Sequence, residues 1–172
     1  MKKISFRNDI LPLKNELYRL ALRITLNPAD AEDVVQETLI KVWNKREKWD
    51  DIESIDAFCL TICRNLSIDK MKKMENQNQS LEEAESDAPD HSYSSNPEEQ
   101  MMQQDRIALI RRLINLLPEK QRSAIQLRDF EGKSYKEIAN IMAISEEQVK
   151  INIFRARQAI RQKYIEIEKY GL

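Results

Sequence analysis

The chain has 172 residues, enough for one ordinary domain or two small ones, and its 28 basic and 29 acidic side chains leave a formal net charge of -1. With two Gly and five Pro, it has too few turn-forming residues for a fold of many short strands. It is rich in residues that favour helices. We therefore predict an all-α protein.

Several classes of protein are disfavoured. No apolar run approaches the roughly 18 residues of a membrane-spanning helix, and the N-terminal residues lack the apolar core of a secretory signal. Cys59 and Cys63 lie one helical turn apart and fit no disulfide framework. The single histidine, His91, leaves little imidazole chemistry for an enzyme or a metal site. We expect a cytoplasmic protein without catalytic activity, metal or cofactor, and without direct membrane insertion.

Three helices are predicted in the N-terminal part. Apolar residues at helical spacing over 10–24 indicate the first. Asn27 and Pro28 are typical of the N-cap and first position of the second helix. A third is predicted over about 54–73. The predicted core face of the second helix comprises Val34, Val35, Thr38, Leu39, Val42 and Trp43.

The distribution of charge divides the chain. Residues 1–75 carry a net charge of +1, residues 76–105 hold eight acids and no Lys or Arg, and residues 106–172 carry +6. Segment 76–96 also has few large apolar side chains, so burial cannot offset the entropy of ordering it. We predict a flexible acidic linker at 76–96 between two small helical domains, 1–75 and 97–172. A long solvated loop within one domain is the alternative.

The C-terminal part is predicted to start with two helices. Pro97 begins the first. Pro118 begins the second, which ends near Gly132, a residue suited to a left-handed C-cap. The predicted inner face of the first helix comprises Met102, Arg106 (by its apolar stem), Leu109, Leu113 and Leu116.

Two further helices form the clearest motif. Residues 134–137 and 145–148 each fit a capping box, and a three-residue turn at 143–145 separates the two helices. This spacing is typical of a helix-turn-helix, whose second helix enters the DNA major groove. A basic, solvated helical hairpin is the alternative. Candidate DNA-binding residues are Ser134, Ser145, Gln148, Lys150, Ile151, Asn152, Phe154, Arg155 and Arg157.

Four stretches resemble two conserved regions of bacterial sigma factors. DAEDVVQETLIKVW (30–43) and residues 57–69 with the lysines that follow resemble the second region. Residues 116–139 and 149–157 resemble the fourth. These two regions with only a linker between them resemble the extracytoplasmic-function (group IV) sigma factors. The VKINIF run within the last stretch is also similar to members from Bacteroidetes.

The resemblance implies a transcription initiation factor that is monomeric when free. It also implies three partners: core RNA polymerase (β′ clamp and β subunits), promoter DNA and an anti-sigma factor. In the family the anti-sigma factor is commonly bound to the membrane. It implies that the helix-turn-helix reads the minus-thirty-five element. Polymerase binding is assigned to the outward face of the second helix: Asp30, Asp33, Gln36, Glu37 and Ile40. Binding of the minus-ten element is assigned to the third helix and the loop before it: Lys48, Trp49, Arg64, Asn65, Lys70, Lys72 and Lys73.

Alternatives remain open for some of these residues. Trp49 suits stacking on a melted base and core packing equally well. The acidic face of the second helix is also compatible with ordinary solvation. Cys59 and Cys63 are read as small buried hydrophobes rather than metal ligands.

The chain departs from the family at certain positions. Thr61 and Asn152 replace frequent arginines, and Ala143 replaces a frequent glycine. If Ala143 is left-handed, the strain costs about 1–2 kcal/mol. A stand-alone helix-turn-helix regulator is the main rival function, and a helical adaptor that binds only protein is another. The acidic helix face argues against the regulator, and the +6 charge of the C-terminal part argues against the adaptor.

Overall fold

The computed structural model describes residues 3–76 and 97–170. Every regular element in these two ranges is a helix, which confirms the predicted fold class. The predicted linker, apart from its first residue, lies outside the described residues, and so does His91. In neither range does a helix have the length and apolar character needed to cross a bilayer.

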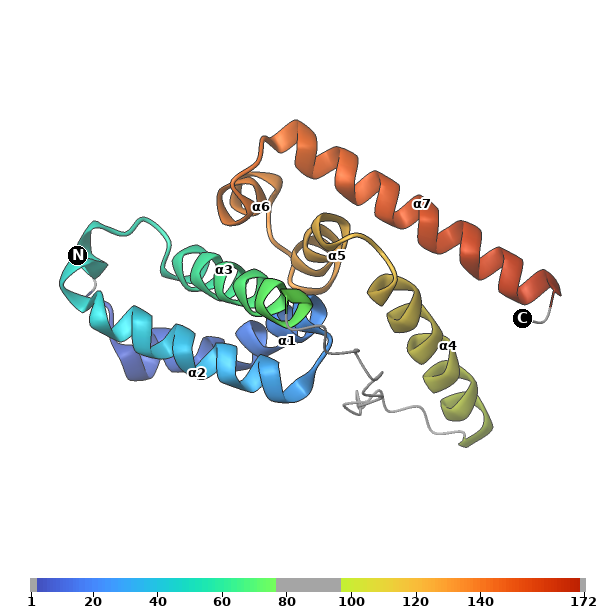
Figure 1. Ribbon diagram of the computed structural model, residues 1–172, viewed down its shortest axis with the longest axis horizontal. Coiled ribbons are helices and arrows are strands. Elements are labelled where there is room, and N and C mark those ends of the chain that lie inside the picture. Colours follow the sequence, from blue (N-terminus) through green and yellow to red (C-terminus); the bar gives the residue numbers. More distant parts are fainter. Residues whose placement is uncertain (1–2, 77–96, 171–172) are drawn as a thin grey trace.

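Three α-helices build the N-terminal unit: α1 (Lys14–Thr25), α2 (Pro28–Asn44) and α3 (Ile55–Asn76) (Figure 1). Two short helical turns, η1 (Phe6–Ile10) and η2 (Leu11–Leu13), come before α1. A third, η3 (Arg46–Asp51), joins α2 to α3. The three α-helices pack on one another. Apolar residues with helical spacing meet between them, chiefly Leu17, Leu20, Ile24, Val34, Val42, Leu60 and Cys63.

Local capping sets the sharp turn from α1 to α2. Leu26 closes α1 in the left-handed conformation, with φ 58°. The side chain of Asn27 then accepts the backbone N–H of Asp30 at 3.1 Å, and Pro28 occupies the first helical position. The cap predicted from the sequence is confirmed, and it fixes where the acidic face of α2 begins.

The C-terminal unit consists of α4 (Pro97–Asn115), α5 (Glu119–Ile125) with the π-helical turn η4 (Gln126–Phe130), α6 (Tyr135–Met142) and α7 (Glu146–Tyr170). The long helix α7 contacts α4, α5 and α6. In Figure 1 it runs along the outer edge of the molecule, away from α1 and α2.

The predicted inner face of α4 is only partly correct. Leu113 is buried, but Leu116 is 80% exposed and Met102 is 59% exposed. Ile114 and Leu117 are buried instead. Because α4 ends at Asn115 and the chain turns there, the helical period does not extend to residues 116 and 117.

The two units pack together, a point that the sequence left open. The apolar cluster of the N-terminal unit continues into the C-terminal unit without a break. Helix α6 lies against α3, and α5 lies against α1 (Figure 1). The C-terminal members of the shared cluster are Ala124, Leu127, Ile138, Ala139, Ile141, Met142, Val149 and Ile153.

Candidate nucleic-acid and protein interfaces

The outward face of α2 is acidic and accessible. Asp33, Gln36, Glu37 and Ile40 are exposed, and Asp30 is half-buried. Ile40 is 60% exposed and gives this acidic face an apolar component. Trp43, expected in the core, is 46% exposed, because it lies three residues after Ile40 on the same outward face of α2. The Phe6 ring, 5.5 Å away by centroids, meets it edge to face. The apolar end of this face is therefore larger than predicted.

An ion pair joins this face to α3. Lys70 Nζ lies 3.2 Å from a carboxylate oxygen of Asp33, and both side chains remain partly solvated. Exposed pairs of this kind contribute only about 0–1 kcal/mol to stability. The carboxylate of Asp33 therefore remains accessible to a partner despite its ion pair with Lys70.

Trp49 packs in the core. It is 7% exposed, and its indole Nε1–H donates to the carbonyl of Val42 at 3.0 Å. Its ring lies 6.1 Å from that of Trp43 and 6.5 Å from that of Phe6, measured between centroids. Of the two readings that the sequence left open for Trp49, the structure favours core packing, in which the indole holds η3 against the end of α2. The neighbouring Lys48 is exposed.

The residues of α3 that were assigned to DNA are only partly exposed. Asn65, Lys72 and Lys73 are exposed, as expected. The expectation that Arg64 is exposed is wrong, since its side chain is 8% exposed. Its Nη2 lies 2.9 and 3.1 Å from the two carboxylate oxygens of Glu119 in the C-terminal unit.

The helix-turn-helix has the predicted caps. Ser134 accepts the N–H of Glu137 at 3.1 Å, and Ser145 accepts that of Gln148 at 3.1 Å. The Glu137 and Gln148 side chains return to the cap backbone, which completes both capping boxes. Helix α6 ends at Met142 and α7 begins at Glu146, so the three-residue turn is confirmed.

The outward face of α7 presents charged and apolar side chains together. Lys150, Ile151, Phe154 and Arg155 are exposed, as are both cap serines, and Phe154 is 66% exposed. Asn152 is half-buried, and its Nδ2 donates to the carbonyl of Gln148 at 2.8 Å. Asn152 therefore has fewer free polar groups for base edges than predicted.

Two cations beside this face have intramolecular partners. Arg157 Nε donates to Asp129 at 3.1 Å, and that hydrogen bond raises the pKa of Arg157 above its ordinary value. Lys150 Nζ lies 5.5 Å from the ring centroid of Tyr135. Lys150 remains exposed beside this ring. The guanidinium of Arg157 is occupied by Asp129 in this structure.

Comparisons with known proteins show the family of the chain. The Sigma-70 region 2 family matches residues 10–77, and the Sigma-70 region 4 family matches residues 107–160. The RNA polymerase sigma-H factor of Pseudomonas aeruginosa is 31% identical over 160 residues, which cover 88% of this chain and 83% of that protein. The ECF RNA polymerase sigma factor SigL of Mycobacterium tuberculosis is 34% identical over 146 residues, covering 84% and 80%. The chain belongs to the ECF sigma factor family.

Solved structures share the fold. The sigma factor RpoE in complex with the anti-sigma factor NepR from Bartonella quintana has a TM-score of 0.75 at 26% identity, covering 91% of this chain and 94% of that chain. CnrH in complex with the cytosolic domain of CnrY has a TM-score of 0.64 at 19% identity. Sigma factors are transcription initiation factors rather than enzymes, and this class applies to the present chain.

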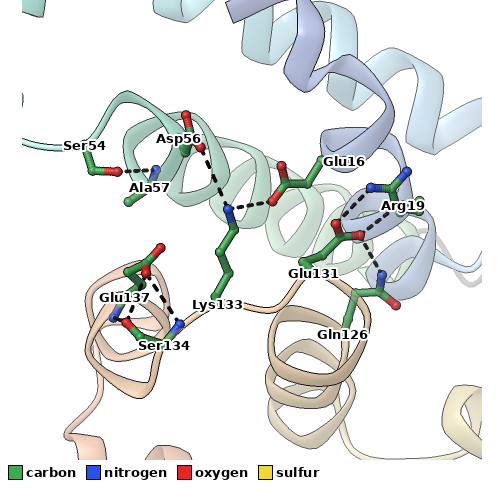
Figure 2. A network of polar contacts seen from close by, with 10 residues as sticks. All are labelled: Glu16, Arg19, Ser54, Asp56, Ala57, Gln126, Glu131, Lys133, Ser134 and Glu137. Carbon is green, nitrogen blue, oxygen red and sulfur yellow. Dashed lines mark hydrogen bonds and ion pairs between the residues drawn. The ribbon is translucent and has the colours of Figure 1, made fainter. Parts of the chain in front are cut away.

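Polar contacts join the two units of this sigma factor at a seam between α1, α3 and the loop from η4 to α6 (Figure 2). Lys133 Nζ points between Glu16 and Asp56, at 3.0 and 3.9 Å from their carboxylates. Burial alone would lower the pKa of Lys133, but the hydrogen bond that Lys133 donates to Glu16 and the charges of nearby acids raise it above its ordinary value.

A second contact lies beside the first. Arg19 donates to both carboxylate oxygens of Glu131, at 2.6 and 2.8 Å, and Gln126 donates to the same carboxylate at 3.2 Å. Sequence reasoning missed these seam residues. Arg19 and Glu131 are 112 positions apart, and no periodic pattern links residues at that distance.

Both cysteines lie in the core of the N-terminal unit. Cys59 and Cys63 are free and fully buried, and Cys63 Sγ donates to the carbonyl of Leu17 at 3.3 Å. Burial raises the pKa of each thiol to about 12. Among the described residues no group of three His, Cys, Asp or Glu side chains is placed to hold a metal ion. The thiols act as small apolar side chains.

Proposed function

We propose that this chain directs bacterial core RNA polymerase to specific promoters and assists their opening. In this proposal, α2 docks on the β′ clamp, α3 and the loop before it engage the minus-ten element, and α7 reads the minus-thirty-five element. Residues 1–75 and 97–172 are the two functional domains. The proposed setting is the cytoplasm, with an anti-sigma factor as the inhibitory partner.

The observation that carries the proposal is the occurrence of two sigma regions, in order, on one chain with matching surfaces. A stand-alone DNA-binding regulator has no use for the exposed acidic and apolar face of α2, where Ile40 and Trp43 are 60% and 46% exposed. A protein-only adaptor has no use for a helix-turn-helix with Lys150 and Arg155 exposed on its second helix. One chain that presents both surfaces fits a subunit that connects polymerase to DNA.

The physical roles follow from the side chains. Exposed carboxylates at 33 and 37 supply long-range attraction to a basic surface, and Ile40 supplies apolar area at the end of the same face. On α7, Arg155 and Lys150 supply attraction to phosphates, and Ile151 offers an apolar surface suited to a thymine methyl. Tight caps at both helix starts hold α7 rigidly for this reading.

The experiment is co-elution of the purified protein with core RNA polymerase, followed by run-off transcription from genomic fragments. We expect a stable complex and new promoter-specific transcripts. Asp33→Lys combined with Glu37→Lys is expected to weaken polymerase binding by at least about tenfold, because like charges across an interface are strongly unfavourable. Both residues are exposed, so the helical content should not change.

The matched control is Glu75→Lys with Glu168→Lys, which alters two exposed acids outside α2 by the same net charge. The control should bind polymerase like the wild type. Equal binding by both variants would remove α2 from the interface. DNA binding without co-elution would favour the stand-alone regulator over the proposed function.

A further inference from the structure

We propose that Asp129 and Arg157 are positioning residues for the reading of bases by α7, and that Arg157 supports this reading without contacting a DNA phosphate. The proposal rests on the proposed function, because it concerns the helix assigned to the minus-thirty-five element. It changes the role of Arg157, which the sequence placed among the candidate DNA-binding residues.

The ion pair between Asp129 and Arg157 has a two-point geometry. Arg157 Nε donates to one carboxylate oxygen of Asp129 at 3.1 Å, and Nη2 donates to the other. Two parallel hydrogen bonds between a planar guanidinium and a carboxylate fix the direction of approach as well as the distance. Asp129 belongs to the π-helical turn η4 and lies 28 positions before Arg157, so the pair ties η4 to α7 in the tertiary structure.

Arg157 projects from the edge of the buried face of α7. It follows Ala156 and comes about one turn after Ile153, and both of these residues are buried. Lys150 lies on the same edge, about two turns earlier. The guanidinium of Arg157 is directed toward η4, whereas Ile151 is exposed on the face proposed to read bases. Arg157 is therefore placed to hold the helix from beside its reading face.

Three cations gather around one aromatic ring next to this pair. The guanidinium carbon of Arg128 lies 4.2 Å from the ring centroid of Tyr135, and Lys150 Nζ lies 5.5 Å from it. Arg157 is close enough to Tyr135 for an electrostatic interaction. Neighbouring like charges repel, and the carboxylate of Asp129 offsets the charge of Arg157. The pair therefore favours close packing of α7 on η4 and α6.

A DNA phosphate is a poor competitor for Arg157. To contact a phosphate, the guanidinium would exchange one charge-assisted pair for another, which gains little. The exchange would also leave the carboxylate of Asp129 beside the DNA backbone, where like charges are strongly unfavourable. Both considerations predict that the pair persists when α7 binds DNA.

Base reading requires α7 to be held in one orientation. Ser145 caps the start of the helix, and Val149 and Ile153 bury its inner face. Burial of apolar surface is non-directional, so it permits small rotations and tilts of the helix. The Asp129–Arg157 pair adds a directional restraint near the middle of α7. Side chains that recognise a ligand must be held to within about 0.5 Å, so loss of this restraint should impair base discrimination more than general attraction to DNA.

The test compares the binding of the full chain to two DNA duplexes over a series of salt concentrations. One duplex is selected from a random-sequence pool by the wild-type chain, and the other is its scrambled version. Fluorescence anisotropy gives the ratio of the two affinities, which measures base reading. It also gives the slope of log affinity against log salt concentration, which reports the number of phosphate contacts.

The principal variant is Asp129→Ala with Arg157→Met, which removes the pair, preserves the net charge and keeps an apolar stem at position 157. We expect the affinity ratio to fall at least about fivefold, as for the loss of one base contact, with an unchanged salt slope. The side chains of Arg157 and Asp129 are 50% and 33% exposed, so removal of the pair should change the free energy of unfolding little. Urea unfolding checks that the variant is folded.

The rescue variant is Asp129→Arg with Arg157→Asp, which reverses the polarity of the pair at the same net charge. We expect it to recover most of the affinity ratio. Lys163→Met with Glu166→Ala is the matched control, because it removes another exposed pair of α7, at 3.7 Å, and it should leave both the ratio and the slope unchanged. Arg155→Ala removes an exposed cation assigned to phosphate, so it should weaken binding to both duplexes and make the slope shallower by about 0.9.

Four results would overturn the positioning role. An unchanged affinity ratio in the principal variant would show that the pair does not affect base reading. A slope shallower by about 0.9 in both double variants would show that Arg157 contacts a phosphate. A reversed pair that fails to recover the ratio would show that the two residues act separately, and selection of no sequence by the wild type would show that α7 reads no bases. None of these measurements uses polymerase, so loss of co-elution alone would count against the proposed function and leave the positioning role standing.

Discussion

The turn of the helix-turn-helix contains a strained residue whose relief can be measured. Ala143 ends α6 at φ 55° and ψ 45°, and its N–H donates to the carbonyl of Ala139. For a residue with a Cβ, this left-handed conformation raises the free energy of the folded state by about 1–2 kcal/mol. Ala143→Gly removes that strain and loses little packing, since the residue is exposed.

Glycine also raises the conformational entropy of the unfolded chain, and this effect lowers the free energy of unfolding by about 0.4–1 kcal/mol. The difference between the midpoints of these ranges predicts that Ala143→Gly raises the free energy of unfolding by about 0.8 kcal/mol. For a chain of this size, that corresponds to a rise in Tm of about 1–4 °C. Urea unfolding followed by circular dichroism measures the change, with equal m-values confirming that the compactness of the end states is unaltered.

Gly132 supplies the matched control. It has φ 68°, and a Cβ built there would meet no atom within 4 Å. Gly132→Ala should therefore lower the free energy of unfolding by about 0.5–1 kcal/mol through backbone strain alone. The reasoning is refuted if Ala143→Gly destabilises the protein, or if Gly132→Ala stabilises it.

Three further predictions follow from the described contacts. Trp49→Ala should lower the free energy of unfolding by about 3–5 kcal/mol in denaturant titrations, because it removes a buried ring and its bond to Val42; a loss below about 1 kcal/mol would contradict core packing. Arg155→Ala should weaken binding to duplex promoter DNA and leave polymerase co-elution intact; equal loss of both would show a structural role. The thiols of Cys59 and Cys63 have pKa values near 12 in the folded chain and an ordinary value of 9.0. The unfolded chain releases these protons first, so the free energy of unfolding should fall as pH rises from about 9 toward 12. Cys59→Ala with Cys63→Ala should flatten this dependence, and an unchanged slope would mean that other groups cause it.

Local patterns explain most of what could be predicted. The cap at Asn27 and the capping boxes at Ser134 and Ser145 involve residues three or four positions apart, so sequence spacing alone reveals them. The same argument holds for the exposed face of α2 and for the buried face of α7, where Val149 and Ile153 meet the core.

The predictions that failed concern chain ends and distant partners. Leu116 lies just beyond the end of α4, where the helical period no longer holds, and Trp43 lies three residues after Ile40 on the outward face of α2. Trp49 lies in a turn whose side chain could face solvent or core, and only packing against Phe6 and Val42 decided between them.

By itself, the sequence determined the helices, their caps, the helix-turn-helix and the two regions of the family, because each depends on neighbours within a turn or two of helix. Only the tertiary structure decided that Arg64 is hidden and that Arg19 meets Glu131, 112 residues away. Such pairs are set by how the two units pack. Side-chain charge and spacing along the chain do not encode that packing in any periodic form, so the seam had to be seen in three dimensions.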